Sequence, residues 1–151
     1  MIRIIYTLFM LFSFKMGLTQ WQYMELPAGK VALTSDPRSD YHLFMTKTNN
    51  MIFLGLSGDV FCNENPQVEM LFVFKDLQTS KLSLASQNIS KIENGELISA
   101  NLLITDPVLL FRNICEKSIK CTVTVFDECT RIKYYDFDMR RFTESYDYLN
   151  E

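Results

Sequence analysis

The residues whose type and spacing could carry chemistry lie near the C-terminal end: Asp127, Glu128, Asp136 and Asp138. Two carboxylates that face each other can hydrolyse a glycosidic bond, and a cluster of carboxylates can bind calcium. Calcium loops, however, alternate their acids closely around a glycine, and this segment contains no glycine. We therefore interpret these side chains as solvated acids at turns and strand edges. The alternative is a cell-wall or glycan hydrolase that uses Glu128, Asp136 or Asp138.

Nucleophilic catalysis would need a base beside a serine or cysteine, and the chain has a single histidine, His42. His42 lies in the sequence YHLFMT among apolar residues, which favours a structural or surface role. The sequence has no Gly-x-Ser-x-Gly, no Walker-type phosphate loop and no His-Glu-x-x-His. We therefore assign no catalytic residue, no metal ligand and no cofactor, and we predict a protein that is not an enzyme.

The cysteines Cys62, Cys115, Cys121 and Cys129 are candidates for disulfides. An even count favours disulfides in an exported chain, and four cysteines allow three pairings. We expect Cys115 to pair with Cys121, because the five residues between them let a helix end fold back onto the next strand. Cys62 would then pair with Cys129 and stabilise the fold by about 4 kcal/mol in the chain-entropy model. The alternatives are a zinc site, disfavoured because no Cys-x-x-Cys occurs, and buried thiols that pack as small hydrophobes.

The first nineteen residues have the layout of a secretory signal peptide. Arg3 provides a positive start, residues 4–14 form an apolar run too short to span a membrane, and Gly17 and Thr19 precede a cleavage site before Gln20. The alternative is a buried helix of a cytosolic domain, since Lys15 interrupts the apolar stretch and no Ala-x-Ala is present. The layout predicts a periplasmic or secreted protein with no stable membrane span after cleavage.

The remaining residues, 20–151, are predicted to form one domain around one core. Removal of the leader takes away two positive charges, Arg3 and Lys15, so the formal net charge falls from −3 to −5. An acidic balance argues against nucleic acid as a partner, because phosphate recognition demands clustered lysine and arginine. The predicted partner is instead another envelope or secreted protein.

Short apolar runs separated by turn residues predict an antiparallel β-sandwich of about eight strands. Asn94-Gly95 favours a type I′ turn and gives the clearest hairpin, and a second hairpin is expected around the polar tip at residues 47–50. The segment VEMLFVFK is apolar on both faces, which places it centrally in a sheet. The candidate strand segments are residues 30–34, 41–46, 51–57, 68–75, 81–86, 89–93, 96–98, 101–105, 122–126 and 130–137, and residues 21–24 could begin a strand or an extended arm.

Two helices are expected. Asp106 is suited to cap a short helix at residues 107–116, because Pro107 at the first helical position lacks only an N–H that would be unpaired. Phe142, Tyr146 and Leu149 recur at helical spacing and predict a C-terminal helix at residues 140–149.

The C-terminal third runs as VLLFRNICEK, CTVTVFDECTRIKYYDF and DMRRFTESYDYL, which is a helix, a strand pair around an acidic tip and a second helix. This order resembles the closing segment of two families of small exported bacterial β-sandwich proteins. They are the type VI secretion-associated periplasmic family and the invasion-associated locus B family. Phe137, Asp138, Met139 and Phe142 match the apolar and acidic positions of a stretch before the last helix, whereas Arg141 replaces its glycine. The resemblance implies a fold and a compartment, and it transfers no catalytic residue.

A tyrosine-rich surface is the candidate binding site. Strand alternation leaves either Tyr134 or Tyr135 outside, and exposed tyrosines frequently anchor interfaces. Together with Tyr146 and Tyr148 they form a candidate partner surface. The sequence thus predicts a non-enzymatic protein-binding domain of the bacterial envelope, such as an accessory factor, an inhibitor or an immunity-type protein. Carriage of a small ligand between the sheets is a further alternative.

Overall fold

The computed structural model describes residues 20–128 and 132–151, so the predicted leader at residues 1–19 lies outside the described residues. The fold is mainly β, with antiparallel pairing throughout, and the described residues hold twelve strands rather than about eight. The strands are β1 (Gln22–Leu26), β2 (Gly29–Ser35), β3 (His42–Thr48), β4 (Met51–Ser57), β5 (Gln67–Phe74), β6 (Thr79–Leu84), β7 (Ser86–Asn88), β8 (Lys91–Glu93), β9 (Glu96–Ser99), β10 (Asn101–Ile104), β11 (Ser118–Phe126) and β12 (Lys133–Asp138).

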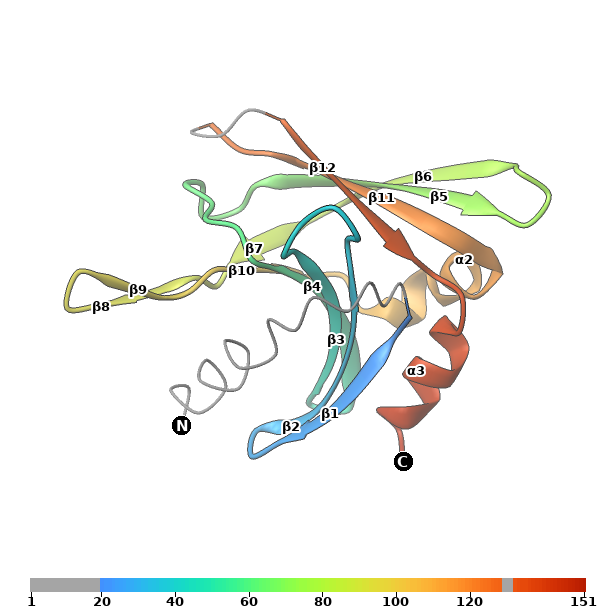
Figure 1. Cartoon of the computed structure of the whole chain (residues 1–151), viewed down its shortest axis with the longest axis horizontal. Helices are drawn as coiled ribbons and strands as arrows, with labels where there is room; N and C mark the ends of the chain where they lie inside the picture. The colour runs from blue at the N-terminus through green and yellow to red at the C-terminus, as the bar shows by residue number, and fades with distance from the viewer. Residues whose placement is uncertain (1–19, 129–131) are drawn as a thin grey trace.

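Two sheets face each other (Figure 1), a six-stranded sheet in the order β1-β2-β3-β4-β10-β7 and a four-stranded sheet in the order β12-β11-β5-β6. Alternate residues of both sheets point inward and join one core cluster. Leu43 and Met45 of β3 and Met70 and Phe72 of β5 are fully buried in it. The sequence VEMLFVFK forms β5, whose central position between β11 and β6 confirms the prediction from its two apolar faces.

Both predicted hairpin turns are present. Strands β3 and β4 pair from His42↔Ser57 to Thr48↔Met51 around Asn49 and Asn50, whose φ values of 50° and 62° are left-handed. Two consecutive positive φ values define the type I′ geometry that asparagine tolerates. Asn94 and Gly95 repeat this geometry between β8 and β9, with φ values of 53° and 80°.

The pair β8–β9 belongs to neither large sheet and is here called the arm. It projects from the end of the six-stranded sheet at the left of Figure 1. Its base is held by hydrogen bonds that Ser90 and Lys91 make with Asn101 and Ser99. An isolated two-stranded ribbon is marginally stable in water, so these contacts at the base must keep the arm ordered.

The predicted helix at residues 107–116 is in fact two short elements, a 3-10 turn η1 (Val108–Leu110) and a helix α2 (Arg112–Lys117). Pro107, rather than Asp106, occupies the cap position of η1, and no side chain caps it. Phe111, with a φ of −129°, interrupts the helical path because its side chain turns into the core.

The C-terminal helix α3 (Phe142–Tyr148) lies within the predicted residues 140–149. Its buried side joins the core through Phe142, which packs edge-on against Trp21 with 5.9 Å between ring centroids. Tyr148 packs against Tyr23 of β1 at 4.9 Å. These aromatic contacts fix α3 beneath the β1–β2 end of the six-stranded sheet.

Candidate functional site

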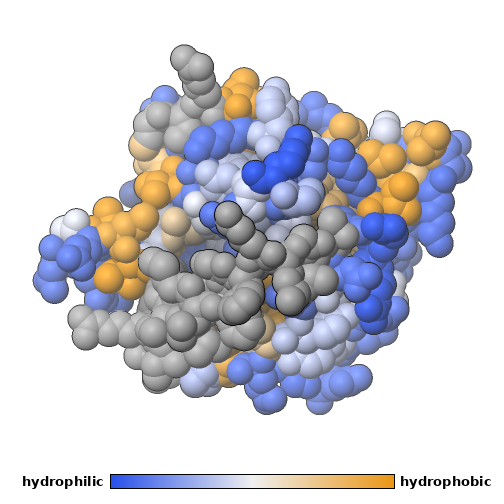
Figure 2. Space-filling view, viewed as in Figure 1, coloured by the Kyte–Doolittle hydropathy of each residue, from blue (hydrophilic) through white to orange (hydrophobic). Residues whose placement is uncertain are grey.

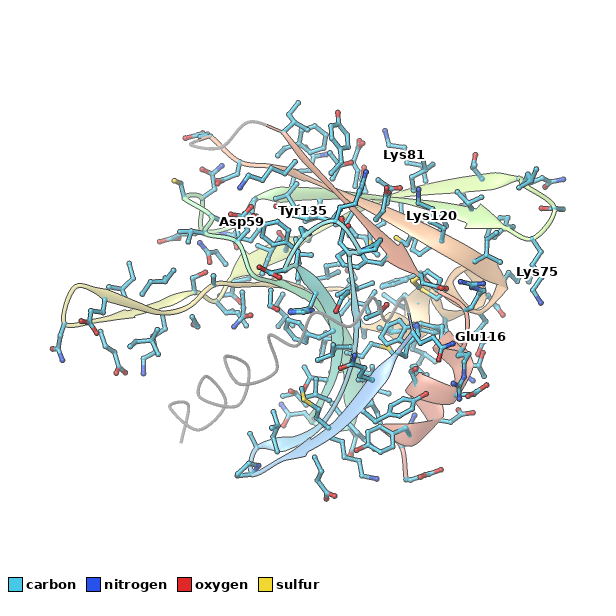
Figure 3. All side chains as sticks on the ribbon, in the orientation of Figure 1. Asp59, Lys75, Lys81, Glu116, Lys120 and Tyr135 are labelled. Atoms are coloured by element: carbon cyan, nitrogen blue, oxygen red, sulfur yellow. The ribbon has the colours of Figure 1, made fainter. Side chains whose placement is uncertain are left out.

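A buried carboxylate links the ends of the two sheets. Asp59 follows Gly58, which turns the chain out of β4 with a φ of 108°, and a Cβ at Gly58 would lie 2.8 Å from the carbonyl oxygen of Asp40. Asp59 Oδ2 accepts a hydrogen bond from Tyr135 Oη at 2.6 Å and pairs with Lys133 Nζ. Figure 3 shows Asp59 and Tyr135 approaching from the two sheets.

Tyr135 is 2 % exposed and serves this link as a hydrogen-bond donor. Burial, and then the hydrogen bond to Asp59, raise the pKa of the Tyr135 phenol far above its ordinary value. The phenol therefore remains protonated at any physiological pH, and the group acts as a structural tie instead of a nucleophile or base.

A second inter-sheet link connects the β2–β3 loop to β12. Asp36, only 3 % exposed, accepts the backbone N–H of Asp136 at 3.0 Å and that of Arg38 at 2.8 Å. Arg38 Nη2 in turn donates to Asp136 Oδ2 at 2.8 Å. Thr122 Oγ1 donates to Asp136 Oδ1 at 2.5 Å, and Lys120 lies 3.2 Å from the carboxylate.

The Asp136 carboxylate is held in its ionised form. Burial alone would raise its pKa, but the hydrogen bonds from Thr122 and Lys120, with the charges of Lys120 and Arg38, lower the pKa below its ordinary value of 3.8. A general acid in glycoside hydrolysis requires the opposite shift. Asp136 is therefore suited to hold its cationic partners.

Three of the four acids predicted to share one end of the last hairpin are each held by a different contact. Asp127 accepts the backbone N–H groups of Cys62 at 2.9 Å and Asn63 at 2.8 Å, while Asp138 pairs with Arg140. Glu128 is exposed. Within residues 20–128 and 132–151, no three His, Cys, Asp or Glu side chains are grouped to hold a metal ion.

His42 pairs with Ser35 across β2 and β3, with 2.7 Å between Ser35 Oγ and His42 Nδ1. Burial lowers the pKa of His42, and the charge of Asp40 partly opposes this shift. The imidazole is consequently neutral at pH 7. The contact lies on a regular strand pair, where it orders the ring on the outer side of the six-stranded sheet.

The expected pairing of Cys115 with Cys121 is wrong, because both are free and fully buried thiols. Cys115 on α2 and Cys121 on β11 both belong to the core, where they pack as small hydrophobes. Burial raises the pKa of each thiol.

Cys62, by contrast, is disulfide-bonded. Its expected partner Cys129 lies outside the described residues, so the pairing of these two cysteines stays a prediction. The hydrogen bond that the backbone N–H of Cys62 donates to Asp127 supports it, since Asp127 precedes Cys129 by two residues.

The four tyrosines predicted to form a partner surface do not share one. Tyr134 is 64 % exposed on the outer side of β12, whereas Tyr135 points inward and Tyr146 is 8 % exposed. Tyr146 is buried because α3 turns it toward the core, with Arg112 stacked over its ring at 4.4 Å. Tyr148 is half-buried against Tyr23. Only Tyr134 stands out as an exposed tyrosine of this set.

An open groove of about 570 Å³ runs along the edge between β5, β6 and β7. It is lined by Pro66, Leu84, Ser86 and Thr105 among others, and Ser86 Oγ is already bonded to the carbonyl of Pro66. The groove is shallow and lies at a sheet edge. It is therefore not the cavity between the sheets that carriage of a small ligand would require.

Large apolar side chains are exposed on the arm, a feature that the sequence analysis did not anticipate. Ile92 and Leu97 pair across β8 and β9 and are 67 % and 46 % exposed. Ile89, beside the arm, is also exposed. Figure 2 shows hydrophobic residues along this projection. The alternation of apolar residues around Asn94-Gly95 predicted the hairpin but could not show that no sheet would cover it.

No known protein family, curated protein or solved structure matches the chain. Among the described helices, none has the length and apolar character needed to cross a membrane.

Proposed function

We propose that this chain is an exported β-sandwich domain of the bacterial envelope that binds another protein and has no enzymatic role. The observation that carries the proposal is the exposed Ile92–Leu97 pair on the arm. Exposed apolar pairs on a projecting element are costly in water and are typical of protein interfaces. An accessory factor, inhibitor or immunity-type protein would use such an element to enter a cleft of its partner.

Export is supported by two independent features. Residues 1–19 have the composition of a signal peptide, and Cys62 is disulfide-bonded. Disulfides persist mainly in oxidising compartments such as the periplasm. Both features fit a periplasmic or secreted protein.

The alternative function, a hydrolase of cell wall or glycans, would need two opposed carboxylates with different pKa values. Asp136 is bound to Arg38, Lys120 and Thr122, and Asp138 is bound to Arg140. Peptidoglycan turnover by the purified chain, lost on Asp136→Ala, would restore this alternative.

The arm provides the test of protein binding. We expect the purified chain to recover one stoichiometric partner from the envelope fraction of its host, and the Ile92→Thr/Leu97→Thr double variant to lose at least nine-tenths of that recovery. The fold should survive because threonine suits strands and both side chains are exposed. Leu77→Asn, at a 76 % exposed position in the turn between β5 and β6 of the four-stranded sheet, is the matched control. Equal recovery by all three proteins would contradict the role of the arm, and no stoichiometric partner for the stable chain would contradict the function.

A further inference from the structure

The outer face of the six-stranded sheet carries no charged side chain on its described strands. The strand register places one row of residues outward from each strand, and none of them is Asp, Glu, Lys or Arg. The chain as a whole is 22 % charged, so this depletion is specific to the face. We call it the charge-free face; its members are Gln22, Met24, Leu26, Val31, Leu33, Ser35, His42, Phe44, Thr46, Phe53, Gly55, Ser57, Gln87, Asn101 and Leu103.

The apolar centre of this face is separate from the core. Phe44, Phe53 and Leu103 are partly exposed, and none of them packs in the core cluster. Gly55 keeps the centre flat, because a Cβ there would come within 2.2 Å of Phe44 Cζ. The Phe44 ring therefore lies across β4 at Gly55, in the space that a side chain at this position would occupy.

A polar row borders this apolar centre. Ser35 and His42 pair across the first two strands of the row, and Ser57 and Asn101 follow opposite each other on β4 and β10. Ser57 is only 6 % exposed, yet its hydroxyl makes no hydrogen bond within the described part of the chain. Leaving a buried hydroxyl unpaired costs roughly 1–3 kcal/mol.

The size of the face limits what can bind it. Six strands about 4.8 Å apart and four residue rows about 7 Å apart give an area on the order of 500 Å². A stable dimer buries roughly 800 Å² on each partner, so pairing of two copies through this face alone falls short. A single helix of 16 residues, roughly 10 Å wide and about 24 Å long, crosses the six strands and covers roughly half of this area.

We propose that the charge-free face is the docking surface for one amphipathic helix of the partner protein, whose contacting side is apolar and uncharged. This inference rests on the proposed function and assigns it a second surface apart from the arm. Phe44, Phe53 and Leu103 receive the apolar side chains of the helix. A charged side chain on the helix would lose its hydration over this face without gaining a counter-ion.

The test uses the chain, purified as its host processes it, and a phage-displayed library of random 16-residue peptides as the probe. We expect enrichment of peptides with apolar residues at positions i, i+3 or i+4, and i+7, without charges on that side. Phe53→Glu should weaken their binding at least tenfold, and Phe53→Thr should weaken it about threefold. Leu71→Glu, at an outward position of β5 in the other sheet, is the matched control and should leave binding within twofold.

Circular dichroism and thermal unfolding of each variant separate loss of binding from loss of fold, and the threonine variant keeps the test open if the glutamate variant does not fold. Absence of enrichment, enrichment of charged peptides, or equal binding by the Phe53→Glu and unsubstituted chains would overturn the proposal. A dimer that Phe53→Glu dissociates would also overturn the proposal, because the occupant would then be a second copy of the chain. Competition by a peptide of residues 1–19 would overturn it too, because the occupant would then be the chain's own N-terminal segment. Partner recovery that still depends on the arm would leave the proposed function standing in each case.

Discussion

The outer faces of the two sheets differ in the charge of the side chains that they carry. The outer face of the four-stranded sheet carries Glu69, Lys81, Lys120, Asp136 and Asp138, and these charges pair with one another or with neighbouring residues. The charge-free face of the six-stranded sheet has His42 as its single titratable group. The outer face of the four-stranded sheet therefore has the composition of a hydrated surface, whereas the charge-free face has the composition of an interface centre.

This difference also separates how the faces are stabilised. Charged residues on the four-stranded sheet interact through ion pairs whose basic side chains are exposed, and exposed pairs contribute little individually. On the six-stranded sheet, shape dominates, because the Phe44 ring depends on the absence of a side chain at Gly55. On the charge-free face, substitutions that change side-chain volume should therefore lower the free energy of unfolding most. On the outer face of the four-stranded sheet, the largest loss should come from substitutions that break the contacts of Asp136.

The largest effect is expected at Gly55. Gly55→Val should destabilise the chain by about 1–3 kcal/mol in urea unfolding, because the new side chain displaces the Phe44 ring. The double variant Gly55→Val/Phe44→Ala should lose most of this cost, since the two residues are coupled. Thr124→Val, outward on β11, is the control and should change stability by less than about 0.5 kcal/mol. Additive effects at Gly55 and Phe44 would refute the packing explanation.

Loss of the Asp136 carboxylate comes next. Asp136→Ala should cost about 1–2 kcal/mol, because Arg38, Lys120 and Thr122 lose a shared acceptor that is only partly exposed. Chemical denaturation measures the change. Arg38→Ala should lower the free energy of unfolding less in the Asp136→Ala variant than in the unsubstituted chain. Equal losses in the two backgrounds would show that Arg38 and Asp136 do not link the sheets.

The two faces should respond to different pH ranges. The folded chain lowers the pKa of His42 below 6.5, so this contribution to stability is full above that value and declines as pH falls through the lowered pKa. Asp136, whose pKa lies below 3.8, loses its contribution only in stronger acid. Thermal unfolding from pH 8 to pH 3 should show both steps, and His42→Gln should remove the upper one alone. An unchanged upper step in that variant would assign it to another group.

The smallest effect is expected for the Glu69–Lys81 pair, whose side chains lie 2.6 Å apart on the outer face of the four-stranded sheet. Lys81→Ala should cost less than about 1 kcal/mol at low salt, because both groups are hydrated. The difference should vanish in 1 M salt, where the Debye length is about 3 Å. A cost that persists at high salt would show that the aliphatic stem of Lys81, rather than its charge, stabilises the sheet.

Local signals in the sequence predicted much of the fold. Asn94-Gly95 and Asn49-Asn50 identified their turns because positive φ values restrict the residues that can stand there. The strand count was too low because a strand such as β7 has weak alternation of its own and is defined by its pairing with β10. The helix at residues 107–116 was interrupted by core packing of Phe111, which a periodicity argument does not contain.

The candidate sites were less predictable because they depend on register. Alternation showed that Tyr134 and Tyr135 point to opposite sides, but only the pairing Val123↔Tyr135 decides which one is buried. The bond from Tyr135 to Asp59 joins residues 76 positions apart and leaves no local pattern. Spacing placed Cys115 and Cys121 near each other, yet it could not distinguish two packed thiols from a disulfide. The charge-free face likewise exists only once six strands are aligned.

The contacts of Asp127 have a consequence for how the chain oxidises. They position the backbone of Cys62 through long-range hydrogen bonds that form only when β11 is in place, so folding can precede and direct its oxidation. Meanwhile burial keeps the thiols of Cys115 and Cys121 protonated, and a protonated thiol does not attack a disulfide. Folding thus protects the Cys62 disulfide from exchange with these two thiols, and this protection is absent until β11 joins its sheet.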